Sequence, residues 1–280
     1  MAQGTNTGPL ALSLSASART LSMGDIGVAG RDDDVIFYNP AQLVVARGTS
    51  FSLARLSPTA RGATMSNGIR IGSGAIGFGA NYLEYQRPAI YPVSRNQVLD
   101  PASVVGSSLL GVLGYAQTYK GTRIGASAKY AVDGDATDRY RNIYGDVGLG
   151  RDFGRYSAGL AVQNIGSSLD RGVVNIKVPT MATLGVSTAR SFGPFDGAAT
   201  AGVSYSKEDE VTVGGGGEIN WGWLSGYNIA LRAGAHQARQ DGDTELMGGV
   251  GFTADRMTFD VAAERLPGNR AGYRAGIRIR

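Results

Sequence analysis

The chain between residues 122 and 132 reads Thr122-Arg123-Ile124-Gly125-Ala126-Ser127-Ala128-Lys129-Tyr130-Ala131-Val132. Every second residue from Ile124 onward is apolar, whereas Arg123 and Lys129 fall among the residues between them. Successive side chains of a β-strand point to opposite faces of the sheet. The alternation therefore predicts a strand with one apolar face and one polar, partly charged face.

The same alternation recurs along the chain, for example over residues 229–236, 257–264 and 271–280. These strands run to about ten residues, longer than the five or six that are usual in soluble sheets. A tilted strand of this length crosses a bilayer, with its apolar face toward lipid and its polar face toward the lumen of a closed barrel. The side chains that we expect to line the lumen are Arg123, Lys129, Arg232, His236, Asp260, Glu264, Arg274 and Arg278.

The turn residues divide the chain into fourteen expected strands, so the predicted fold class is all-β, a transmembrane antiparallel β-barrel. Tight turns alternate with longer connections, of which residues 85–105 and 165–179 are the longest. Outer-membrane barrels have short periplasmic turns and longer outer loops, so we expect these two segments outside the cell and both termini in the periplasm. The expected strands are 48–57, 61–71, 74–84, 106–118, 121–132, 140–152, 155–164, 180–190, 196–206, 211–222, 226–237, 244–254, 257–265 and 271–280.

Composition narrows the function classes. The chain has no cysteine, which excludes disulfides, thiolate zinc sites and cysteine nucleophiles. No apolar run approaches the roughly 20 residues of a membrane-spanning helix, and the first residues lack the pattern of a signal peptide. The formal net charge is +4, but the basic residues are scattered at alternate strand positions rather than clustered. We therefore expect no nucleic-acid partner.

Residues 1–47 lack the alternation and are expected to form a hatch inside or beneath the barrel of residues 48–280. Asn39 followed by Pro40 is a start signal for a short helix, with Asn39 as N-cap and Pro40 at the first helical position. The acidic run before it includes Asp33 and Asp34, which we expect to pin the hatch by ion pairs with the basic lumen.

The same N-terminal segment carries a signature of about 26 residues. It comprises Ala18-Arg19-Thr20-Leu21-Ser22-Met23-Gly24-Asp25-Ile26-Gly27-Val28-Ala29, followed by Asp32-Asp33-Asp34-Val35-Ile36-Phe37-Tyr38-Asn39-Pro40-Ala41-Gln42-Leu43. This order of Ala-Arg, Met-Gly, paired acids and Asn-Pro-Ala resembles the N-terminal signature of the PorV/PorQ proteins. Those proteins belong, with the long-chain fatty-acid transporter FadL, to one superfamily of fourteen-stranded barrels with an N-terminal hatch. The resemblance implies the outer membrane of a Gram-negative bacterium.

Patterns that suggest other chemistry have simpler interpretations. Residues 72–77 match G-x-G-x-x-G, but they continue into a strand, whereas the dinucleotide motif must open a helix. Residues 214–217 are four glycines in a strand-like run, which favours close packing in the lumen or a bulge. A hydrolase built on the only histidine, His236, would need a nucleophile and an orienting partner close in space, and the sequence identifies neither. The three aspartates of residues 32–34 lack the spacing of a calcium loop. We expect no catalytic residues, metal or cofactor.

Three functions remain as alternatives. The resemblance implies an accessory or anchoring barrel that binds protein partners in secretion to the cell surface. The alternative is a FadL-like channel for the uptake of hydrophobic small molecules, although FadL-type transporters are longer, with large outer loops. An outer-membrane enzyme is the third and least favoured. Short loops and a charged lumen provide little of the apolar cavity that ligand sites favour, so the accessory role is the main prediction.

Overall fold

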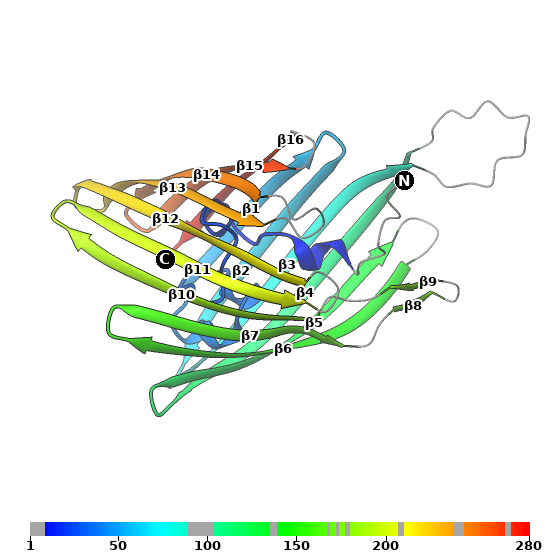
Figure 1. Cartoon of the computed structure of the whole chain (residues 1–280), viewed down its shortest axis with the longest axis horizontal. Helices are drawn as coiled ribbons and strands as arrows, with labels where there is room; N and C mark the ends of the chain where they lie inside the picture. The colour runs from blue at the N-terminus through cyan, green and yellow to red at the C-terminus, as the bar shows by residue number, and fades with distance from the viewer. Residues whose placement is uncertain are drawn as a thin grey trace, which may run out of the picture.

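The computed structural model describes residues 9–88, 103–134, 139–166, 169–171, 174–176, 180–206, 210–237, 244–266 and 270–280. It is a closed barrel of fourteen antiparallel strands, in which each strand pairs with its neighbours and β1 closes on β16 (Figure 1). A separate small hairpin is formed by β8 (Leu169–Arg171) and β9 (Val174–Ile176). The barrel strands are β1 (Gly48–Ser57), β2 (Ala60–Ile71), β3 (Gly74–Pro88), β4 (Ser103–Tyr119), β5 (Thr122–Gly134), β6 (Arg139–Phe153), β7 (Tyr156–Gly166), β10 (Met181–Phe192), β11 (Phe195–Ser206), β12 (Glu210–Leu224), β13 (Tyr227–Gln237), β14 (Thr244–Ala254), β15 (Met257–Leu266) and β16 (Arg270–Ile279).

The prediction of a fourteen-stranded barrel is confirmed, and the strand bounds agree with the expected ones to within four residues. The two longest expected outer loops are a different case. Residues 89–102 and much of 167–179 lie outside the described residues, so their placement stays a prediction. The β8–β9 hairpin inside the second loop was not foreseen.

Large apolar side chains cover the outside of the barrel. Leu113, Ile143 and Leu231 are each at least 60% exposed, whereas Arg123 and Lys129 are buried on the inner face of β5. This inverts the arrangement of a soluble protein and is the pattern of a barrel whose outer face contacts lipid. No helix in the described part of the chain is long and apolar enough to cross a membrane.

The N-terminal residues run through the lumen as four short helical turns. These are η1 (Leu10–Ser13), α1 (Ala18–Ser22), η2 (Val35–Phe37) and η3 (Pro40–Val44). The backbone N–H of Ala11 donates to Ser108 Oγ at 3.1 Å, in the half of the barrel that carries the long connections. From there the hatch descends to Gly48, at the end that carries the tight turns. Between these two points the hatch folds back on itself: Asp32 contacts Arg280 at the tight-turn end, whereas the carbonyl of Phe37 accepts from Gln163 Nε2 in the half with the long connections.

The first described residues of the hatch and the last residue of the chain lie in different halves of the barrel. The strands of the barrel do begin and end on one side, because their number is even. Arg280 lies at the tight-turn end, but the first described hatch residues lie in the opposite half (Figure 1). Residues 1–8 lie outside the described residues, so the expectation that both ends of the chain lie in the periplasm stays a prediction.

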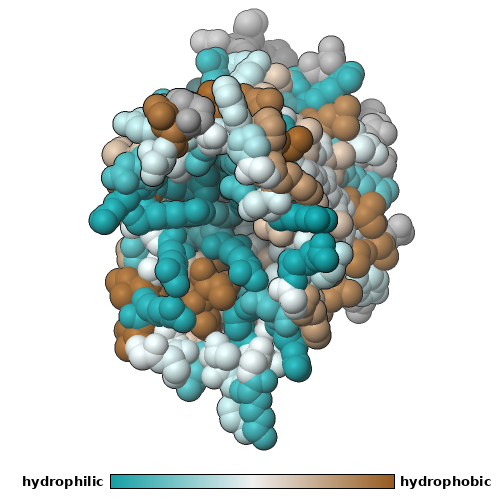
Figure 2. All heavy atoms as spheres, turned by 90° about the vertical axis from the view of Figure 1, so that its left-hand side faces the viewer, coloured by the Kyte–Doolittle hydropathy of each residue, from teal (hydrophilic) through white to brown (hydrophobic). Residues whose placement is uncertain are grey.

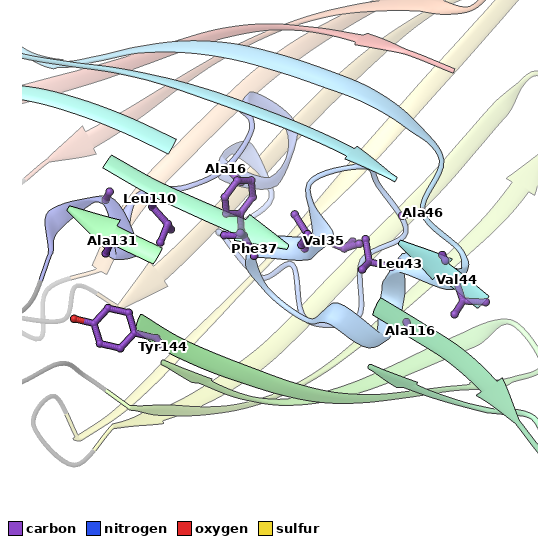
Figure 3. Close-up of a cluster of buried hydrophobic side chains, with 14 residues drawn as sticks. Ala16, Val35, Phe37, Leu43, Val44, Ala46, Leu110, Ala116, Ala131 and Tyr144 are labelled. Atoms are coloured by element: carbon purple, nitrogen blue, oxygen red, sulfur yellow. The ribbon is translucent and has the colours of Figure 1, made fainter. Parts of the chain in front are cut away.

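The hatch makes apolar contacts on two sides of the barrel, a small cluster of α1 with β14 and β15 and a larger one with β3–β6. Phe37 and Leu43 of the hatch join Leu110, Ala131 and Tyr144 of β4, β5 and β6 in one buried cluster (Figure 3). Part of the inner face of this wall is thus apolar, where the alternation predicted a polar lumen. Each large apolar side chain buried in this way stabilises docking by roughly 1.5–3 kcal/mol.

Candidate functional site: the hatch and the lumen

Three arginines and three carboxylates form a closed ring of ion pairs between the hatch and the opposite wall. Arg19 and Asp32 come from the hatch, and the remaining members come from β12, β13, β15 and β16. Each member contacts two others, so every charge in this ion-pair ring is balanced. In order around the ring the members are Arg19, Asp32, Arg278, Asp260, Arg232 and Glu218.

The ring is almost completely shielded from solvent. Arg19 keeps 19% of its side chain exposed, and the other members keep 7% or less. Buried charges are costly unless they are paired, so the pairing holds the hatch in place and removal of one member leaves others uncompensated. The distances are 3.0 Å for Asp32 Oδ1–Arg278 Nη1, 2.7 Å for Arg278 Nε–Asp260 Oδ2, 2.6 Å for Asp260 Oδ1–Arg232 Nη1 and 2.9 Å for Arg19 Nε–Glu218 Oε2.

Asp32, rather than its two neighbours, makes the ion pairs to the wall. Asp33 and Asp34 form no ion pair with any described residue. The prediction that the acidic run pins the hatch by charge therefore named the wrong residues, because Asp32 makes these pairs. Asp34 instead accepts from Thr20 Oγ1 at 2.6 Å. Consecutive side chains point in different directions, and here Asp32 is the one that also reaches Arg280, at 2.8 Å.

The environments of these aspartates shift their pKa values in opposite directions. Burial raises the pKa of Asp32, but the charges of Arg19, Arg278 and Arg280 outweigh it and hold that pKa below its usual value. Burial, together with the neighbouring aspartates, raises the pKa of Asp33 to about 7. The hatch therefore contains a carboxyl group that is protonated well above the usual range.

Asn39 and Pro40 begin η3 as the sequence predicted. Asn39 Oδ1 accepts from the backbone N–H of Ala41 at 3.0 Å, and Pro40 is the first residue of the turn. The amide nitrogen of Asn39 also donates to the carbonyl of Val28 at 2.8 Å and to that of Leu149, on β6, at 3.0 Å. One side chain thus caps the turn and ties the hatch to the wall.

Arg123 and Lys129 lie on the inner face of β5, on the other side of the lumen from the ring. Arg123 Nη1 pairs with Asp152 Oδ2 at 2.8 Å. Lys129 Nζ contacts Asp146 Oδ2 at 2.8 Å and Asn164 Oδ1 at 2.9 Å. Both charges are thus paired with carboxylates of the barrel wall.

The remaining residues that were expected to line the lumen surround a cavity of about 250 Å³ on the long-connection side of the hatch. His236 Nε2 lies 2.9 Å from Glu245 Oε2. Glu264 and Arg274 line the same cavity, and the hydrogen bonds of Arg274 to described residues are long ones, of 3.4 Å, to wall hydroxyls. Hatch residues 24–26 line this cavity on the side toward the tight turns.

A second cavity, of about 510 Å³, lies on the tight-turn side of the hatch. Figure 2 shows this end of the barrel hollowed and lined by hydrophilic side chains. Ile26 lines both this cavity and the cavity on the long-connection side. Residues 24–27, a short stretch of hatch backbone, therefore separate the two spaces.

Glycines of the wall let this stretch lie directly against the strands. A Cβ atom at Gly234 would lie 2.3 Å from the backbone nitrogen of Gly24, and one at Gly216 would lie 2.7 Å from the Cα of Met23. Gly24 itself has φ +85°, which a residue with a side chain rarely adopts. Within the glycine run 214–217, Gly214 and Gly216 thus serve close packing in the lumen, as predicted, with the hatch as the packed partner.

Arg19, Asp32 and Glu218 were not singled out from the sequence. Glu218 shares the inward parity of Gly214 and Gly216, so the alternation alone could have found it. The pairing of Arg19 with Asp32 follows from the path of an irregular segment, which no periodic pattern encodes.

Of three comparisons with known proteins, the one with solved structures places the fold. No family model matches the chain, and no curated protein matches it. Among solved structures, the Pseudomonas putida toluene transporter TodX has a TM-score of 0.62 at 11% identity, covering 94% of this chain and 96% of that one. The CymD monoaromatic hydrocarbon channel has a TM-score of 0.60 at 12% identity, covering 95% and 96%. At these identities the likeness shows only that this chain has the same fold as these channels.

Proposed function

We propose that this chain is an outer-membrane channel for small hydrophobic molecules, closed by its N-terminal hatch. The observation that carries the proposal is the pair of cavities, of about 250 and 510 Å³, that share Ile26. Displacement of residues 24–27 alone would join them into one path along the barrel. In this proposal residues 1–47 act as the hatch of a barrel formed by residues 48–280, with the tight turns in the periplasm.

The class of cargo is suggested by the neighbours in fold, which are a toluene transporter and a monoaromatic hydrocarbon channel. The cavity on the long-connection side has apolar surface from Leu14, Ile26, Leu56 and Val213. Its volume, about 250 Å³, is just below the roughly 300 Å³ at which ligand pockets usually begin, which favours a small ring over a long chain.

Toluene uptake by whole cells tests the proposal, because the intact outer membrane is the barrier that such a channel must bypass. We expect a Gram-negative host that produces this chain to take up toluene faster than the same host with an empty vector. Ile26→Ala should speed uptake further, because it widens the point where the cavities meet. Ile143→Ala, a matched control on the lipid face, lines neither cavity, does not touch the hatch and should leave uptake near the wild-type rate. Uptake equal to the empty vector for both wild type and Ile26→Ala would refute the channel.

The ion-pair ring favours a second candidate, the PorV/PorQ-like accessory role in secretion. A stationary plug needs firm attachment, and six paired charges with little solvent exposure provide it. In that role the barrel would anchor protein partners of a secretion complex, and the hatch would never open. Recovery of secretion components with the crosslinked protein, together with toluene uptake at the level of the empty vector, would favour this alternative.

A further inference from the structure

A groove of about 710 Å³ lies on the outer wall of the barrel, toward the tight-turn end. Small residues form its floor: Gly197 and Ala199 of β11, Gly217 of β12 and Ala233 of β13. These positions share the outward parity of exposed apolar side chains on the same strands, so the groove faces lipid. Its volume falls within the roughly 300–1,000 Å³ of ligand sites.

Large apolar side chains form the sides of this groove. Tyr156 of β7, Phe192 of β10, Ile219 of β12 and Leu231 of β13 line it, and each is at least 54% exposed. A flexible hydrocarbon chain could lie on the glycine and alanine floor between them. The walls alone would accept any acyl chain, so they determine the shape of the occupant and not its charge.

Two arginines stand at the tight-turn end of the groove. Arg155 lies in the turn between β6 and β7, and Arg190 lies two residues before the end of β10, with its guanidinium 5.2 Å from the ring centroid of Phe192. Neither forms an ion pair with a described residue. A charge on the lipid face is costly near the middle of the bilayer and tolerated near the interface, where aromatic side chains also gather. Arg190 thus marks the level of the lipid headgroups.

Phosphate is the group that these two guanidiniums suit, since arginine binds phosphate oxygens through two parallel N–H donors. We propose that the groove binds one anionic phospholipid of the inner leaflet, with its phosphate on Arg155 and Arg190 and an acyl chain along the glycine and alanine floor. The proposal is independent of whether the lumen conducts. It assigns a specific lipid site to one sector of the wall, β7 and β10–β13.

Native mass spectrometry of the detergent-solubilised full chain tests the site with two lipids that share their acyl chains, dioleoylphosphatidylglycerol and dioleoylphosphatidylcholine. We expect wild type to bind the anionic lipid on the order of tenfold more tightly. Arg155→Gln with Arg190→Gln should remove this preference. Ala233→Phe, which fills the groove, should weaken the binding of both lipids.

Matched controls separate this site from general attraction. Lys120→Gln with Arg151→Gln removes the same charge from the same end of the barrel, and both residues also lie beside aromatic rings, at 5.3 and 5.6 Å, but neither lines the groove. Ala126→Phe adds a ring to the lipid face elsewhere. A heat-dependent gel shift confirms that each variant is folded. The proposal is overturned if the control pair abolishes the preference equally, if Ala233→Phe acts no differently from Ala126→Phe, or if lipid A binds more tightly than phosphatidylglycerol.

Discussion

Asp32→Asn should loosen the hatch while leaving the barrel intact. Asp32 is 5% exposed and contacts three arginines, so the substitution removes a central member of the ion-pair ring. Loss of one partner from a buried pair typically costs about 3–5 kcal/mol. In this variant Arg19 still pairs with Glu218, and Arg278 still pairs with Asp260. We therefore expect a smaller cost than for an isolated buried pair, about 2–3 kcal/mol. A tenfold change in population for each 1.4 kcal/mol gives roughly 30- to 150-fold more released hatch.

Amide hydrogen exchange measures this release directly. The amides of residues 18–38 should exchange faster by about that factor, while those of the barrel strands should not change, because the closed ladder satisfies its own hydrogen bonds. Glu84→Gln is the control: it makes the same chemical change in a single pair, Glu84 Oε1–Arg61 Nη2 at 2.7 Å, on the exposed surface. Such pairs contribute about 0–1 kcal/mol. Equal exchange in the Asp32 and Glu84 variants would show that the ring does not hold the hatch.

Three further predictions concern the same segment. Because the pKa of Asp33 is raised to about 7, the docked hatch holds a proton that the released hatch loses near pH 4, so wild-type protection from exchange should fall between pH 4 and 7 and then level off. Asp33→Asn should reduce this fall, and burial, which also raises the pKa of Asp34, accounts for the part that remains; a fall as large as that of wild type would argue against the role of Asp33. Asn39→Ala removes the cap of η3 and the contact to Leu149, so it should cost on the order of 1 kcal/mol or more, seen as faster exchange at the amide of Ala41; an unchanged rate there would argue against the cap. Deletion of residues 4–38 should raise ion conductance in planar bilayers without loss of the heat-dependent gel shift, and unaltered conductance would mean that this segment is no plug.

The barrel could be predicted because its information is local and repeated. In each strand, the period of two indicates which side chains face inward and which face outward. On β5, the alternation from Ile124 to Val132 is visible in the sequence and is found again in the structure. Turn positions then follow from where the period breaks. The cap at Asn39 was predictable for the same reason, since its partner Ala41 lies two residues away.

The docking of the hatch could not be predicted, because it depends on contacts between distant residues. Asp32, Asp33 and Asp34 are equivalent in the sequence, and only the path of the irregular chain decides which one meets Arg278. The apolar inner face at Leu110 was missed for a related reason. Alternation predicts a polar face toward a water-filled lumen, but here the hatch replaces the water and brings its own apolar side chains.

The two sides of the hatch therefore differ in what their separation from the wall would cost. On the β3–β6 side, opening would expose the apolar cluster around Phe37 to water, at about 25 cal/mol for each Å² of apolar surface, with no compensating interaction. On the β12–β16 side, opening would expose only the smaller apolar cluster of Ala18 and Leu21 with Met247 and Ala262. It would return the charges of the ion-pair ring to water, where hydration would offset much of the lost pairing. Residues 24–27 lie against the glycines of β12 and β13, next to the ionic side. The hatch should thus separate first where its charges are, and pivot on its apolar side.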